Sequence, residues 1–145
     1  MNQWAAGGVW FALVWFASAV AFSHASVETA KTTQDGVYTL SQAASGKKVY
    51  EEKCSSCHLG SLEGGTNESP ALKGDEFISH WSGKSLRTLY SRILSTMPAA
   101  DPGSLSEKET LDVVAYMLQQ NGFRPGKTGL QTPNQLRKIQ FKAAK

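Results

Sequence analysis

A length of 145 residues fits one domain, and hydrophobic residues make up an ordinary 41% of the chain. The net charge of +3 hides a division: nine basic and twelve acidic residues lie between positions 26 and 123, whereas six basic and no acidic residues follow position 123. An acidic body with a basic C-terminal segment argues against nucleic acid as a partner.

The first 25 residues predict an export signal. Residues 4–22 form an apolar run of 19 residues without a charge, and Ser23 and Ala25 supply the small side chains that a signal peptidase requires. We therefore expect cleavage after Ala25. The run is also close to the roughly 20 residues that span a bilayer, so an uncleaved membrane anchor remains the alternative. Both outcomes deliver the chain from residue 26 onward to the periplasm or another extracytoplasmic space.

Residues 26–38 are polar, contain the turn-forming pair Asp35-Gly36, and predict a linker. The folded domain is expected to span residues 39–123. Thr39 and Gln42 have the spacing of a capping box and open a predicted helix over residues 40–53. A glycine inside a helix costs about 1 kcal/mol relative to alanine, so Gly46 predicts the close approach of another helix.

The middle of the domain predicts a long loop followed by a helix. Residues 59–80 are rich in Gly, Ser, Asn and Pro and are expected to form mostly ordered loop. The helix that follows is opened by Ser82 or Ser85, and it should end at Met97 because Pro98 disfavours helical geometry in the residue before it. Its apolar face is predicted to consist of Leu86, Leu89, Tyr90, Ile93 and Leu94.

A last helix is predicted over residues 107–120. Ser106 and Glu109 have the spacing of a second capping box, and Asn121-Gly122 is a typical stop signal. Because no segment shows strand-like alternation, the expected fold class is all-α. The basic segment 124–145 has two interpretations. We favour a solvated, disordered chain end; the other is a short helix, opened by Pro133, that docks on an acidic partner or a membrane face.

The stretch CSSCH at residues 54–58 contains both cysteines of the chain and one of its three histidines. On a helical turn Cys54, Cys57 and His58 lie on one face. C-x-x-C-H is the spacing of covalent haem attachment, in which two thiols bond the haem and the histidine binds its iron. A structural zinc site requires four ligands. A redox dithiol is typical of a βαβ context. A disulfide between cysteines three positions apart stabilises a fold little. The sequence therefore favours haem over these three alternatives.

The haem iron also needs a sixth ligand, and methionine is the common choice in electron carriers. Met97 is expected on non-helical backbone next to proline, an unusual place for a methionine that only fills a gap in the core. We therefore favour Met97. Met117 falls beside the apolar stripe of the last predicted helix, where core packing is the default. His80 is the alternative ligand, in a bis-histidine site.

Residues 36–124 resemble the class I c-type cytochromes. The resemblance rests on four segments in order: GKKVYEEKCSSCH, SPALKG, STMPAADPGSLSEKE and TLDVVAYMLQQNGF. The last two are similar to cytochromes and cytochrome domains that accept electrons from quinoprotein dehydrogenases. The resemblance implies a bundle of about three to four helices wrapped around one covalently bound haem c.

The same resemblance implies two specific contacts. Gly46 and Tyr50 of the first helix should meet Val113 and Tyr116 of the last helix. The backbone carbonyl of Pro70 should hold the imidazole of the haem-ligating histidine. The chain departs from the family in having Ser69 before this proline, where glycine is frequent, and in carrying a C-terminal segment without an obvious counterpart.

The resulting functional hypothesis is one-electron transfer by a single haem with His58 and Met97 as axial ligands. The protein would shuttle electrons between a periplasmic dehydrogenase, for example a quinoprotein dehydrogenase, and a downstream acceptor. Catalysis is not expected, because six-coordinate iron leaves no position for a substrate. Two alternatives remain: a haem-bearing subunit of a membrane-anchored dehydrogenase or oxidase, and a ligand-binding haem sensor or peroxidase. Membrane association would use residues 4–22 or the basic segment.

Overall fold

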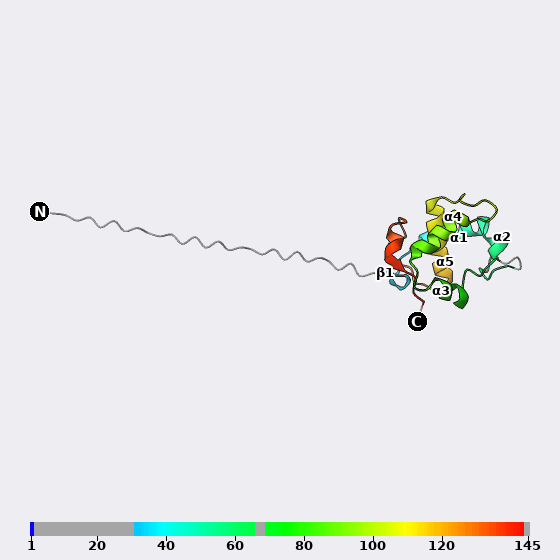
Figure 1. Cartoon of the computed structure of the whole chain (residues 1–145), viewed down its shortest axis with the longest axis horizontal. Coiled ribbons are helices and arrows are strands. Elements are labelled where there is room, and N and C mark those ends of the chain that lie inside the picture. The colour runs from blue at the N-terminus through cyan, green and yellow to red at the C-terminus, as the bar shows by residue number, and fades with distance from the viewer. Residues whose placement is uncertain (2–30, 66–68, 144–145) are drawn as a thin grey trace.

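The computed structural model describes Met1, residues 31–65 and residues 69–143 (Figure 1). The predicted signal or anchor therefore lies outside the described residues, apart from Met1. The described part is mostly helical, which confirms the all-α class, although it contains five α-helices rather than three or four. These are α1 (Leu40–Lys53), α2 (Ser55–His58), α3 (Asp75–Trp81), α4 (Leu86–Thr96) and α5 (Glu107–Gln120). Shorter elements are β1 (Lys31–Thr32), η1 (Thr33–Asp35), η2 (Gln135–Lys138) and β2 (Ile139–Gln140).

Helices α1 and α5 cross at Gly46, as the resemblance implied. A Cβ atom placed on Gly46 would lie only 1.8 Å from the backbone oxygen of Asp112 and 2.9 Å from the backbone nitrogen of Val113. One turn later the rings of Tyr50 and Tyr116 pack with their centroids 5.4 Å apart. The cost of a glycine in α1 is thus offset by a helix crossing that no larger residue permits.

The ends of the long helices follow the predicted signals, with one exception. In α5 both arms of the capping box are present: Ser106 Oγ accepts the N–H of Glu109, and a carboxylate oxygen of Glu109 accepts the N–H of Ser106. In α1 the Thr39 hydroxyl accepts the N–H of Gln42 as expected, but the Gln42 side chain does not reach back. It instead donates to the carbonyl of Leu130 and accepts from the amide of Leu130, both at 2.9 Å.

The prediction that residues 59–80 are mostly loop was wrong for α3. This helix has only seven residues, too short to be stable by itself. A distant partner supports it: the ring of Phe77 packs on Trp81 of the same helix, with centroids 6.2 Å apart, and also on Phe141, with centroids 5.9 Å apart. A contact with a residue 64 positions away leaves no local signal in the sequence.

The two terminal segments were also predicted wrongly where the structure describes them. Residues 31–38 are not a linker, since β1 pairs in parallel with β2, Lys31 opposite Ile139. Residues 124–143 are not a solvated tail, and the expectation of no strand fails for this short pair. The C-terminal segment buries four large apolar side chains, namely Leu130, Leu136, Ile139 and Phe141. Neither segment has a helical or strand period of its own, so each becomes ordered only against the other and the core.

Further hydrogen bonds and one close approach fasten these segments. The Thr33 hydroxyl donates to the carbonyl of Lys142 at 3.0 Å, and the Tyr38 hydroxyl donates to the carbonyl of Phe123 at 2.6 Å. Gly126 lies against Gly36 so closely that a Cβ on Gly126 would be 1.7 Å from the oxygen of Gly36. All buried hydrophobic residues of the described structure fall between Val37 and Phe141, so this range contains the whole core.

Candidate haem site

The two cysteines lie on a tight turn at the end of α1. Cys54 terminates α1, and its carbonyl accepts the N–H of Cys57 at 3.2 Å and the N–H of His58 at 3.0 Å. Cys54 is half-buried, Cys57 is exposed, and no disulfide joins them. The turn is therefore closed by its own backbone, with both thiols unbonded.

His58 is held in one orientation. Its side chain is buried, and its Nδ1 lies 2.9 Å from the carbonyl oxygen of Pro70. Because a carbonyl can only accept a hydrogen bond, Nδ1 must carry the proton, which leaves the lone pair of Nε2 for a metal. The structure thus contains the Pro70 contact that the resemblance implied.

The residue after His58 is fixed by a tyrosine that the sequence analysis treated only as a packing residue. The Tyr50 hydroxyl donates to the carbonyl of Leu59 at 2.6 Å, and burial raises the pKa of this hydroxyl, so it stays protonated. Leu59 has a left-handed backbone with φ of 60°. Such a conformation is uncommon for a residue with a side chain and persists where its surroundings impose it. The hydroxyl group that tyrosine has and phenylalanine lacks is the sequence feature that could have indicated this hydrogen bond.

The Cys54 thiol does not have the lowered pKa of a reactive cysteine. Burial raises the pKa of Cys54 to about 11, so its thiol is protonated at neutral pH, whereas reactive cysteines have lowered pKa values. Among residues 31–65 and 69–143, no group of three or more His, Cys, Asp or Glu side chains could hold a metal ion. The raised pKa of Cys54 therefore argues against the dithiol alternative.

Met97 lies where the sequence placed it, just after α4. Its backbone is extended, with φ of −122° and ψ of 150°, and its partly buried side chain packs against the edge of the core. Other partly buried apolar side chains at the edge of the core are Leu72, Ile78, Trp81 and Leu94. Met117, in contrast, is a fully buried core residue. His80 is exposed on α3, with its ring 5.0 Å from that of Trp81.

These residues fit a haem. One imidazole has a free Nε2, two thiols precede it at the attachment spacing, and apolar side chains remain only partly covered around the core. Together with the α1–α5 crossing, this arrangement defines a c-type cytochrome domain.

The family comparison agrees. The sequence profile described as "Cytochrome C oxidase, cbb3-type, subunit III" matches residues 41–117, more than half of the chain, and the protein belongs to this family. Its cofactor is covalently bound haem c, and the resemblance to class I c-type cytochromes is confirmed, as is the assignment to electron transport.

Two curated relatives and one solved structure are similar to this chain. The thiosulfate dehydrogenase of Psychrobacter arcticus is 39% identical over 77 residues, which is 49% of this chain and 24% of the relative. The thiosulfate dehydrogenase of Stutzerimonas stutzeri is 34% identical over 79 residues, which is 51% of this chain and 26% of the relative. The chain thus spans about a quarter of each. The structure of the sulfane dehydrogenase SoxCD from Paracoccus pantotrophus shares the fold, with a TM-score of 0.52 and 20% identity over 79% of this chain and 61% of that one.

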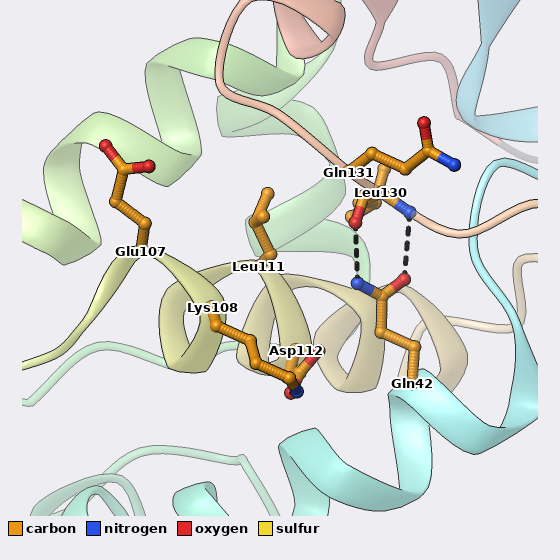
Figure 2. Close-up of a pocket in the computed structure, with 7 residues that line it drawn as sticks. All are labelled: Gln42, Glu107, Lys108, Leu111, Asp112, Leu130 and Gln131. Atoms are coloured by element: carbon orange, nitrogen blue, oxygen red, sulfur yellow. Dashed lines mark hydrogen bonds and ion pairs between the residues drawn. The ribbon is translucent and has the colours of Figure 1, made fainter.

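A pocket of about 430 Å³ lies away from the cysteine turn in the described structure (Figure 2). Three of its polar side chains already have partners: Gln42 pairs with the backbone of Leu130, and the Lys108 ammonium lies 2.6 Å from the carboxylate of Asp112. We therefore interpret it as the seam that joins the C-terminal segment to α1 and α5. No helix within the described ranges is long and apolar enough to cross a membrane.

Proposed function

We propose that this protein is a single-electron carrier whose haem c is attached through Cys54 and Cys57. His58 and Met97 would hold its iron, through the imidazole Nε2 and the thioether sulfur. Bound haem c supplies one-electron exchange between ferrous and ferric iron. The observation that carries the proposal is the hydrogen bond between His58 Nδ1 and the Pro70 carbonyl, because it prepares Nε2 as a ligand.

The chain's own residues contribute rigidity and an apolar environment. The Pro70 carbonyl holds the imidazole of His58, and Tyr50 holds the next residue, Leu59, so the imidazole keeps its orientation when the charge of the site changes. Met97 contributes a thioether from backbone that is extended between α4 and Pro98. Ligands that need not move favour fast electron exchange over binding of small molecules, which supports a carrier rather than an enzyme.

The names of the relatives suggest a partner class. Both curated relatives are thiosulfate dehydrogenases, and this chain matches about a quarter of each. We propose that the electron donor is a dehydrogenase of sulfur compounds in the periplasm, with a quinoprotein dehydrogenase as the other candidate. The proposed functional unit runs from residue 31 to residue 143, because both terminal segments contribute to the core.

Intact mass of the exported protein tests attachment. The expected result is the polypeptide plus one haem that stays bound on denaturation, and the same mass reports whether residues 1–25 are removed. Two cysteines that remain free to alkylate would refute the proposal.

Met97→Ala tests the sixth ligand, with Met117→Leu as the control. The Met97 variant should have a lower reduction potential and should bind carbon monoxide when reduced, whereas the control should do neither. Reduction of the wild-type haem by thiosulfate alone, without a donor protein, would show that the protein is an enzyme.

A further inference from the structure

Four of the six basic residues of the terminal segments lie close to β2. Residues 31–38 and 124–143 contain six basic side chains and a single acidic one, Asp35, whereas residues 39–123 contain eight basic and ten acidic ones. We define the basic face as five exposed side chains around β2 and the ends of its neighbours: Lys31, Lys84, Arg137, Lys138 and Lys142.

Backbone contacts place these residues together. Lys31 pairs with Ile139, the neighbour of Lys138. The carbonyl of Lys84 accepts the N–H of Phe141 at 2.8 Å, and Phe141 precedes Lys142. Ile139 and Phe141 are buried, whereas Lys138, Gln140 and Lys142 are exposed, so the two lysines that flank this stretch face solvent. The carboxylate of Asp35 accepts hydrogen bonds from the backbone and hydroxyl of Thr32, which hold its pKa below the usual value, and the charges of Lys142 and Lys31 lower this pKa further.

The basic face lies away from the haem attachment turn. In Figure 1, β1 and the red C-terminal segment are at one side of the domain and α2 is at the other. A surface that binds the basic face would therefore leave Cys57 and its turn open to a redox partner. This separation makes the face an anchoring surface rather than the point of electron exit.

We propose that the basic face binds the anionic headgroups of a phospholipid membrane. The first argument is its place in the chain: the apolar run of residues 4–22 ends nine positions before Lys31, so even a fully extended connection holds the face within about 32 Å of that run. Whether the run is retained as an anchor or removed after crossing the bilayer, the face follows directly behind it.

The composition of the face is the second argument. Stable protein interfaces are built around buried apolar anchors. In the described ranges the large apolar side chains that are exposed are Met1, Leu40 and Leu59, and none belongs to the basic face. Positive charges that are spread over a surface without an apolar centre fit a fluid anionic membrane better than a protein partner.

The test uses vesicle binding of the haem-loaded protein. A chain that begins at Ser26, exported behind a replaceable signal, contains the whole described core and lacks the apolar run. It is mixed with vesicles of phosphatidylcholine containing about 30% phosphatidylglycerol, or of phosphatidylcholine alone, and the bound fraction is read from haem absorbance after sedimentation. We expect binding to the anionic vesicles only, lost at about 0.5 M NaCl because salt screens exposed charges.

Two double variants of equal net charge locate the surface. Lys31→Gln/Lys142→Gln should weaken binding roughly 25-fold, about fivefold for each basic side chain removed near the membrane. Lys47→Gln/Lys48→Gln, on exposed positions of α1, should change it less than about twofold. Equal loss in both variants, or no binding to anionic vesicles, overturns the proposal. Retention by an acidic protein without vesicle binding would assign the face to a protein partner instead. Neither outcome bears on haem attachment or on electron transfer.

Discussion

Replacement of Gly46 by alanine should be strongly destabilising, although alanine is the better helix former. The new Cβ would lie 1.8 Å from the oxygen and 2.3 Å from the carbonyl carbon of Asp112. Ordinary contact begins near 3.4 Å, so α1 and α5 would have to separate by roughly 1.5 Å at their crossing. The obstacle is backbone, which cannot move aside as a flexible side chain can.

The expected change in the free energy of unfolding of Gly46→Ala is the difference between two opposing effects. Alanine gains about 1 kcal/mol of helix propensity over glycine, whereas overpacking of a tight contact costs about 1–3 kcal/mol and occasionally more. A forced separation of two core helices belongs at or above the upper end of that range. We therefore expect a net loss of about 2 kcal/mol or more in the free energy of unfolding.

Urea unfolding of the haem-loaded protein, followed by haem absorbance, measures this loss. Gly60→Ala is the matched control, because a Cβ there meets no atom within 4 Å and Gly60 does not have a left-handed φ. The control should be neutral or stabilising by up to about 1 kcal/mol, through a less flexible unfolded chain. If Gly46→Ala unfolds at the same urea concentration as Gly60→Ala, the close approach of the two helices is not a constraint and the reasoning fails.

Three further predictions concern the site and its supports. Tyr50→Phe keeps the ring but leaves the carbonyl of Leu59 without this donor, so urea unfolding should show a loss of about 1–3 kcal/mol; an unchanged midpoint would mean that the bond contributes nothing. Lys53, followed by the N-cap serine of α5, lowers the pKa of Glu109 from 4.5 to about 2. The associated stability is therefore present above pH 4.5 and lost as the pH falls from 4.5 toward 2, and Glu109→Gln should remove this part of the pH dependence in acid titrations followed by circular dichroism. Leu136→Ala should cost about 2–5 kcal/mol in thermal or urea unfolding because Leu136 is fully buried, whereas a loose tail would tolerate it.

The haem-attachment turn and the long helices were predictable because their signals are local. A capping box, a proline and a C-x-x-C-H spacing each act within a few residues. Helices α1 and α5 have the predicted bounds, and α4 follows Ser85, one of its two predicted starts, and ends directly before Met97. The close approach of α5 at Gly46 could also be inferred, because a glycine that destabilises a helix requires a compensating contact.

The wrapping segments and α3 could not be predicted in the same way. Their stability comes from pairs such as Phe77 with Phe141 and Thr33 with Lys142, which are 64 and 109 positions apart. Gln42 illustrates the limit most directly. Its position predicted a local cap, but the side-chain amide pairs with Leu130 instead. The carbonyl and N–H of Leu130 satisfy both the nitrogen and the oxygen of this amide.

The spacing of residues along α1 links stability to the haem site. Gly46, Tyr50 and Cys54 follow one another at intervals of four, so they lie along one side of the helix over about 12 Å. The first sets the distance to α5, the second fastens Leu59, and the third begins the attachment turn. A shift of α1 at Gly46 would therefore move Tyr50 and Cys54 together, away from a Pro70 carbonyl that belongs to a different segment. Weakened orientation of the imidazole of His58 should then accompany any loss of packing at Gly46, which makes the helix crossing part of the site itself.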